Sequence, residues 1–155
     1  MPALAQRVRD THAQVNGRNI DLWRRWIADF NARDIEAIVG RCDPNIEFHS
    51  VFAAVGGAVY HGHDGLRAWH RDLEEAWGEE IYLDIEAYFD LGEEILTFFA
   101  YQARGKQSEA AVTMPATVIT RWRDGLVTYI KVYVQRADAL RDLGVSEDEL
   151  EPIAP

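Results

Sequence analysis

The segment from Ile95 to Val134 is typical of an antiparallel β-meander that is apolar on both of its faces. Its three runs are residues 95–101, 112–122 and 126–134, and Asp124-Gly125 before the last run is a hairpin turn signal. Antiparallel sheets commonly leave one face in water, and their strands then alternate apolar with polar residues. Because these runs do not alternate in that way, we expect a core or cavity on one face and a partner on the other.

Strand alternation divides the residues of the last run between the two faces. One face carries Ile130, Val132 and Val134, and the other carries Val127, Tyr129 and Tyr133. We expect Ile130 and Val132 to point into the protein, and Tyr129 and Tyr133 to contact a second subunit. Pro115 lies inside the middle run and has no N–H for a neighbouring strand, so it predicts a bulge or a sharp bend.

Helical periodicity precedes the meander. Asn19 is a suitable N-cap for a first helix, whose apolar stripe consists of Ile20, Trp23, Ile27 and Phe30. The other expected elements are helices at residues 35–39, 64–77 and 136–143 and strands at residues 46–50, 59–62 and 81–90. Because helices come first and a curved antiparallel sheet follows, we predict an α+β domain.

Composition and turn signals divide the chain into three parts. Residues 1–18 are polar and predict a loosely held arm, irregular or partly helical. Residues 19–144 contain all the strong periodic patterns and form the expected domain. Residues 145–155 form an acidic tail, which we expect to be solvated.

Charge and composition limit the classes of partner. The chain has 155 residues, enough for one domain, with a net charge of −10 and a pI of about 4.9. Nucleic acids and anionic membranes attract basic surfaces, so neither is an expected partner. No apolar run approaches the roughly 20 residues of a membrane span, and residues 1–7 lack the apolar segment of a signal peptide. Cys42 has no second cysteine for an intrachain disulfide, and we expect a cytoplasmic protein.

Five short segments carry a resemblance to a known family. They are Trp26–Asp34, Asp43–Phe48, Tyr60–Leu66, Arg123–Leu126 and Ala139–Gly144. In this order and at this spacing they resemble the SnoaL-like branch of the nuclear transport factor 2-like superfamily, over roughly residues 19–144. The resemblance implies a strongly curved antiparallel or mixed sheet wrapped around three helices, which forms a cone with an apolar pocket. It also implies homodimers that pair through the back of the sheet.

The resemblance leaves the activity open, because this family includes isomerases, cyclases, dehydratases, epoxide hydrolases, ligand binders and assembly modules. The catalytic positions of ketosteroid isomerases correspond here to Trp26, to Ser50 or with a shift of one residue His49, and to a residue near Thr117. The acids and arginine of the epoxide hydrolases correspond to Phe99, Tyr101 and Val132. Neither set keeps its chemistry, and the late strands offer no carboxylate for a cyclase before Asp124.

His49 and Tyr101 are the candidate catalytic residues. An imidazole at the end of the strand 46–50 could take a proton near neutral pH, in the region where the family places a base. Strict alternation argues against this role, because it groups His49 with Glu47 and away from Phe48. Tyr101 is either a hydrogen-bond donor into the pocket or an interface residue.

The pocket implied by the resemblance has a candidate lining drawn from helices and strands. Its expected residues are Trp26, Ser50, Tyr60, Trp69, Phe99, Thr117, Ile130 and Val132. Trp26 and Trp69 lie on helical stripes, where a plain core role is the competing interpretation.

His61, His63 and His70 are close in sequence, and His-x-His is a known metal-ligand spacing. A metal site also requires that the ligands converge on one point and that other residues hold them by hydrogen bonds, and the sequence gives no sign of either. We therefore expect these histidines to be solvated and predict no metal site.

Two functions remain. The first is a small-molecule pocket protein that acts as a cofactor-independent isomerase, cyclase or dehydratase on a small hydrophobic organic substrate. Such proton transfers need only a positioned base and a hydrogen-bond donor in a dry pocket, so no cofactor is expected. The second is a non-catalytic ligand-binding or assembly module, which the loss of the family's acids favours.

Overall fold

The computed structural model describes residues 2–53, 57–78, 80–104 and 111–155, with side chains from residue 17 onward. The helices in these ranges are α1 (Pro2–Asn31), α2 (Ile35–Gly40), α3 (Gly62–Trp77), α4 (Arg136–Leu143) and a short 3₁₀ helix (Glu147–Glu149). The strands are β1 (Cys42–Ser50), β2 (Ala58–His61), β3 (Ile81–Asp90), β4 (Glu94–Arg104), β5 (Ala111–Arg123) and β6 (Leu126–Tyr133).

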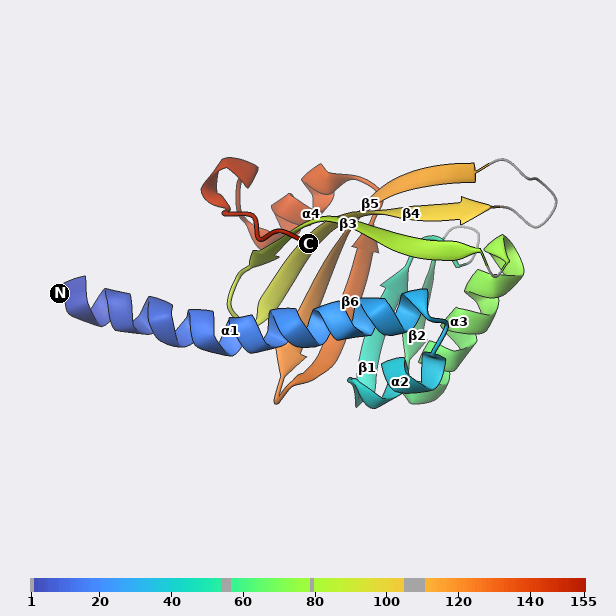
Figure 1. The fold of residues 1–155 in the computed structure, drawn as a ribbon, viewed down its shortest axis with the longest axis horizontal. Coiled ribbons are helices and arrows are strands. Elements are labelled where there is room, and N and C mark those ends of the chain that lie inside the picture. Colours follow the sequence, from blue (N-terminus) through green and yellow to red (C-terminus); the bar gives the residue numbers. More distant parts are fainter. Residues whose placement is uncertain (1, 54–56, 79, 105–110) are drawn as a thin grey trace.

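The strands form one sheet in the order β2-β1-β6-β5-β4-β3. β1 and β6 run parallel, and the other neighbours are antiparallel, so the sheet is mixed. It curves, and α1 crosses in front of it (Figure 1). The expected α+β architecture, a curved mixed sheet wrapped around helices, is confirmed.

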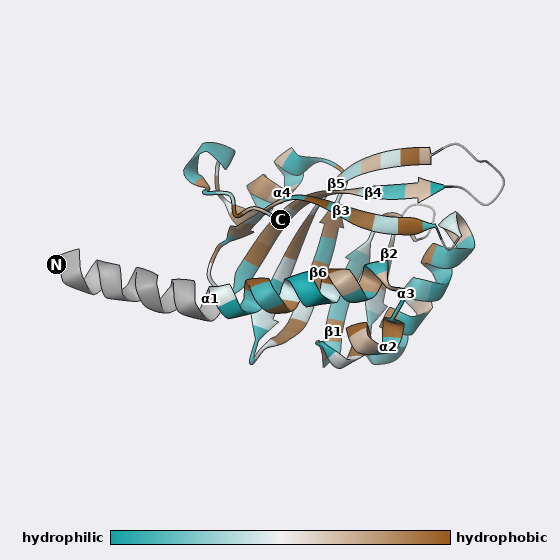
Figure 2. Ribbon diagram, viewed as in Figure 1, coloured by the Kyte–Doolittle hydropathy of each residue, from teal (hydrophilic) through white to brown (hydrophobic). Residues whose placement is uncertain are grey.

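The side of the sheet that faces α1 and α3 carries the main core, and we call it the inner face. Apolar bands recur along β3, β4 and β5 (Figure 2). Ile130 and Val132 of β6 belong to this core with 1% and 4% exposure, as expected. Val127 also belongs to it, so its expected place on the opposite face is wrong. A bulge between Arg121 and Trp122 shifts the register beside it, and one extra residue reverses the side to which a side chain points.

The opposite side, which we call the outer face, is partly covered by α4. A second cluster of buried residues there includes Phe98, Ile119 and Tyr133 together with Ala139 of α4. Tyr133 donates a hydrogen bond to Oδ2 of Asp142 at 2.7 Å. The chain itself therefore covers Tyr133, which we had expected a second subunit to cover.

Helix α1 begins at Pro2, so the helix start expected at Asn19 is wrong, and Asn19 lies inside α1. Proline is well tolerated in the first turn of a helix, because the N–H that it lacks would have no partner there. Gly17 costs only about 1 kcal/mol in a helix interior, too little to end it. No helix in the described ranges is long and apolar enough to cross a membrane.

Pro115 does not form the expected bulge. It pairs with Ala100 in an unbroken register between β4 and β5. On the other side, the pairing with β6 starts only at Thr117. Pro115 lies beyond the end of β6, where its missing N–H interrupts no ladder.

The acidic residues of the C-terminal tail are exposed, but its end is attached to the domain. Ile153 pairs with Tyr88 through two backbone hydrogen bonds of 3.0 and 2.7 Å. Arg24 of α1 donates to the carbonyl oxygen of Ala154 at 2.9 Å. The tail thus joins α1 to β3, one of the two edge strands of the described sheet.

Candidate functional site

The candidate site is an apolar cavity between the helices and the inner face. The helical side chains that line it are Trp23, Trp26, Ile27, Phe30 and Trp69. The strands contribute Phe48, Leu83, Ile85, Thr97, Phe99, Tyr101, Val118, Ile130 and Val132. The free space between these side chains is about 20 Å³, roughly the room that one water molecule needs.

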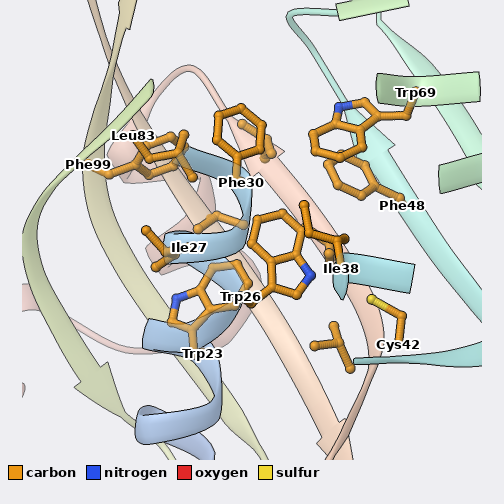
Figure 3. Close-up of a cluster of buried hydrophobic side chains, with 14 of the residues drawn as sticks. Trp23, Trp26, Ile27, Phe30, Ile38, Cys42, Phe48, Trp69, Leu83 and Phe99 are labelled. Atoms are coloured by element: carbon orange, nitrogen blue, oxygen red, sulfur yellow. The ribbon is translucent and has the colours of Figure 1, made fainter. Parts of the chain in front are cut away.

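Helical and strand periodicity bring these residues together. Trp23, Trp26, Ile27 and Phe30 follow one another at intervals that place them on one side of α1. Figure 3 shows their side chains gathered with those of Phe48 and Trp69, which come from β1 and α3. On β4, every second residue points to the same side, so Thr97, Phe99 and Tyr101 share the inner face.

Aromatic rings fill most of the cone. The ring centroids of Phe48 and Trp69 are 4.7 Å apart, and those of Trp23 and Trp26 are 4.8 Å apart. Trp26 links these two pairs, because its ring lies 6.1 Å from that of Trp69. Tilted arrangements at such distances are favourable for aromatic pairs. The interior is therefore apolar, as expected, but it is largely occupied by the protein's own side chains.

Few polar atoms reach the cavity. Trp23 Nε1 donates to Thr97 Oγ1 at 3.0 Å, so this pair is satisfied. Tyr101 is 3% exposed, and its hydroxyl makes no hydrogen bond with the described part of the chain. Burial raises the pKa of Tyr101, which keeps the phenol protonated at neutral pH. Tyr101 can therefore donate a hydrogen bond but cannot act as a base.

Two indole N–H groups are buried without a hydrogen bond of ordinary geometry, those of Trp26 and Trp69. The indole nitrogen of Trp26 points toward the Cys42 sulfur (Figure 3), which is a weak acceptor. Burial raises the pKa of the Cys42 thiol to about 12, and the Trp26 N–H acts in the opposite direction. Cys42 is thus an inert thiol at neutral pH.

His49 lies on the outer face, so its expected place in the pocket is wrong. Its Nε2 is 2.6 Å from Glu47 Oε2, and its ring centroid is 5.4 Å from that of Tyr129. This hydrogen bond is the largest cause that lowers the pKa of Glu47. Alternation along β1 decides the matter, because Phe48 points inward and its neighbours must point outward.

Three further candidates are not part of the cavity wall. Ser50 is buried, and its Oγ accepts a 3.4 Å hydrogen bond from the backbone N–H of Ala53. Tyr60 donates to Asp72 at 2.7 Å, and burial followed by this contact raises its pKa to about 12. Thr117 pairs with Phe98 and Tyr133, which places it on the outer face beneath α4. Their expected position in the pocket lining is therefore wrong.

The remaining candidates, Trp26, Trp69, Phe99, Tyr101, Ile130 and Val132, do lie on the cavity wall. Sequence reasoning did not name Trp23, Phe30, Phe48 and Leu83 as lining residues. A signal for two of them was present, because Trp23 and Phe30 lie on the same helical stripe as Ile27.

The three histidines near α3 are not all solvated. His63 Nε2 lies 2.8 Å from the carbonyl oxygen of Cys42. His70 is 8% exposed, so its expected solvation is wrong, and burial lowers its pKa. No group of three or more possible metal ligands occurs among the residues that the structure describes.

Several solved structures share this fold. An NTF2-like protein of unknown function from Burkholderia pseudomallei matches 80% of this chain and 95% of its own, at 18% identity and a TM-score of 0.69. TerC, co-crystallised with polyporic acid, matches 81% of this chain and 97% of its own, at 21% identity and a TM-score of 0.68. A putative polyketide cyclase from Xanthomonas campestris matches 81% and 96%, at 14% identity and a TM-score of 0.63.

These identities are low enough that the structures establish similarity of fold alone. No curated protein matches the sequence. The family model for the SnoaL-like domain matches residues 23–130, which is more than half of the chain and includes every residue of the cavity wall except Val132. The chain therefore belongs to the family of SnoaL-like domains.

Proposed function

We propose that this protein binds a small, predominantly apolar organic molecule inside the cone, without catalysing its conversion. The observation that carries the proposal is the composition of the cavity wall. Its described residues are aromatic or aliphatic apart from the Thr97 and Tyr101 hydroxyls and the indole N–H groups. A mostly apolar cavity with a few placed polar groups is the usual form of a small-molecule site.

The competing function is a cofactor-independent isomerase, cyclase or dehydratase. It requires a side chain that can accept a proton from the substrate. No carboxylate or imidazole belongs to the described lining, and the protonated Tyr101 phenol cannot fill that role. Binding therefore fits the wall better than proton transfer does.

A ligand larger than a water molecule requires side chains at the cavity wall to turn. Phe52 is half-buried, and its ring packs against that of Tyr101 with centroids 4.7 Å apart. Trp77 Nε1 donates a hydrogen bond to the backbone carbonyl oxygen of Phe52 at 2.9 Å. This hydrogen bond fixes the backbone of Phe52 and not its ring. A rotation of Phe52 can then open a path to Tyr101 without moving the chain. TerC, which has a similar fold, was co-crystallised with an organic compound.

A homodimer is part of the proposal. The outer face outside the area that α4 covers carries Glu47, His49, Arg121, Tyr129 and Lys131, and a second subunit can pack there. Native mass spectrometry of the purified protein reports both the subunit number and any molecule that co-purifies. A bare monomer would contradict the dimer.

Calorimetric titration with ethylbenzene tests the binding site directly. Val132 lines the cavity, so Val132→Phe fills the remaining space and is expected to abolish binding. Lys131→Phe, one residue away on the outer face, and His49→Ala are expected to leave the affinity unchanged. Circular dichroism checks that Val132→Phe remains folded. The proposal fails if the unmodified protein does not bind the probe, or if the outer-face variants lose binding instead.

A further inference from the structure

The end of the chain, residues 150–155, wraps around the edge strand β3. Leu150 packs against the buried cluster on the outer face, whereas Ile153 packs against the main core on the inner face. At the edge itself, Ile153 exchanges two backbone hydrogen bonds with Tyr88, of 3.0 and 2.7 Å. Figure 1 shows the end of the chain beside β3. The segment therefore covers backbone groups of β3 on the side where the described sheet has no further strand.

Arg24 of α1 is a second anchor for this segment. Its guanidinium donates a hydrogen bond to the carbonyl oxygen of Ala154 at 2.9 Å and lies 5.3 Å from the centroid of the Tyr88 ring. One side chain of α1 thus contacts both the tail and the strand to which the tail is bound. Each contact is weak by itself, so together they form a reversible attachment.

The seam between α1 and β3 borders the cavity. Two residues of α1 and two of β3 belong to the cavity wall, which are Trp23, Ile27, Leu83 and Ile85. At one end of the seam, Asn31 binds the backbone of Leu83 directly, through hydrogen bonds of 3.1 and 2.7 Å. About two turns earlier on α1, Arg24 and the tail hold the two elements together.

These two attachments differ in how easily they can open. Asn31 belongs to α1 and binds Leu83 without an intermediary, as donor and as acceptor. In the tail, Ile153 is half-buried, and the other four of residues 151–155 are exposed. A chain end with little buried surface opens locally at a low cost in free energy. The attachment at Arg24 is thus the one that can open while the domain stays folded.

We propose that residues 150–155 are a strap that closes the seam between α1 and β3, and that its release opens an entrance to the cavity. Asn31 remains bound to Leu83 and acts as the pivot, and the turn of α1 around Arg24 moves away from β3. The strap itself concerns the chain alone. The entrance rests on the proposed function, because it requires a molecule that enters the cavity.

Hydrogen exchange measured by mass spectrometry tests the strap without any ligand. Ile153→Pro removes the N–H that donates to Tyr88, and Arg24→Ala removes the second anchor. A turn of α1 that leaves the sheet loses the packing that stabilises the helix, so its amides then exchange faster. In both variants we expect the amides of residues 20–28 to exchange about tenfold faster, with little change in β5. Glu151→Ala, at an exposed position of the same tail, is the matched control and should exchange like the unmodified protein.

Stopped-flow mixing with ethylbenzene tests the entrance. Trp23 and Trp26 line the cavity, so tryptophan fluorescence can follow its occupation. A gate that opens more often speeds entry and exit alike. Both strap variants are therefore expected to raise the association and dissociation rates about tenfold each and to leave the affinity nearly unchanged.

The outcomes separate the strap, the entrance and the proposed function. Unchanged exchange of α1 in Ile153→Pro would overturn the strap. Faster exchange throughout the domain, β5 included, would also overturn it, because the tail would then stabilise the whole fold and not one seam. Faster exchange of α1 with unchanged ethylbenzene rates would overturn the entrance alone. If ethylbenzene does not bind the unmodified protein, the proposed function and the entrance fail together, and the exchange experiment still decides the strap.

Discussion

The two faces of the sheet differ in whether their polar groups have partners within the chain. On the outer face, Arg121 lies 3.2 Å from Glu94, Lys131 lies 3.7 Å from Asp142, and Arg136 lies 2.6 Å from Glu86. On the inner face, no charged side chain belongs to the described cavity wall, and two of its residues, Trp26 and Trp69, have buried indole N–H groups without a hydrogen bond of ordinary geometry. The charged groups named on the outer face thus find partners within the chain, whereas two buried donors on the inner face do not.

This difference changes where a partner is needed. The sequence predicts a cavity behind one face and a protein partner on the other, because both faces look apolar. In the structure, α4 already covers the apolar end of the outer face, and ion pairs satisfy much of the rest. The buried indole N–H groups of Trp26 and Trp69, which have no hydrogen bond of ordinary geometry, belong to residues of the cavity wall on the other side of the sheet.

The largest expected effect is a difference in stability between substitutions at two neighbouring residues of β6, one on each face of the sheet. Ile130 is 1% exposed and lines the cavity, so Ile130→Ala is expected to lower the free energy of unfolding by about 2–5 kcal/mol. Lys131→Ala removes an exposed ion pair and should cost less than about 1 kcal/mol. Urea unfolding of both variants measures the difference. Equal costs would mean that the inner face is not the better packed one.

A second pair makes the same chemical change on both faces. Tyr133→Phe removes the hydroxyl that donates to Asp142 at 2.7 Å, and it is expected to cost about 1 kcal/mol. Tyr101→Phe removes a buried hydroxyl that makes no hydrogen bond in the described chain, so it should be neutral or stabilising. Unfolding curves of the ligand-free protein test this. A clear loss of stability in Tyr101→Phe would reveal a partner for its hydroxyl and break the contrast between the faces.

Much of the fold follows from local patterns. Asp34 accepts a hydrogen bond from the Ala37 backbone as a cap, and Asp124 and Gly125 have the positive φ angles that their hairpin requires. The start of α1 could not be predicted in this way, because residues 2–18 carry no strong apolar stripe. The helix extends through them as a continuation of its later turns. The place of Pro115 depends on how far β6 extends, which no residue near it encodes.

The site was only partly predictable, for a physical reason. Alternation and helical period give the direction of a side chain, so Ile130, Val132 and Trp69 could be placed near the cavity. For His49, strand alternation predicts the outer face, which is correct, whereas the resemblance to relatives predicts the pocket, which is wrong. The filling of the cone depends on how three tryptophans from α1 and α3 pack against one another, which is a property of volume and not of pattern.

The smallest expected effect concerns His70, a buried residue of α3. Burial lowers its pKa, and Arg33 acts in the same direction, whereas Glu74, 3.6 Å away on the same helix, raises it. The unfolded chain binds a proton at a pH near about 6.5, before the folded chain does. Stability is therefore expected to fall as the pH drops below that value, through a window where most carboxylates are still ionised.

His70→Gln removes the group responsible and should flatten this part of the stability profile. The measurement is the urea midpoint of both proteins between about pH 7 and about pH 5. His49→Ala is the outer-face control, since its imidazole lies beside Glu47 and not in the packed interior. If the profile of His70→Gln falls as steeply as that of the unmodified protein, burial of His70 does not govern acid sensitivity. The contrast between polar groups that have partners on the outer face and buried groups that lack them would then apply to the buried donors of the cavity wall alone.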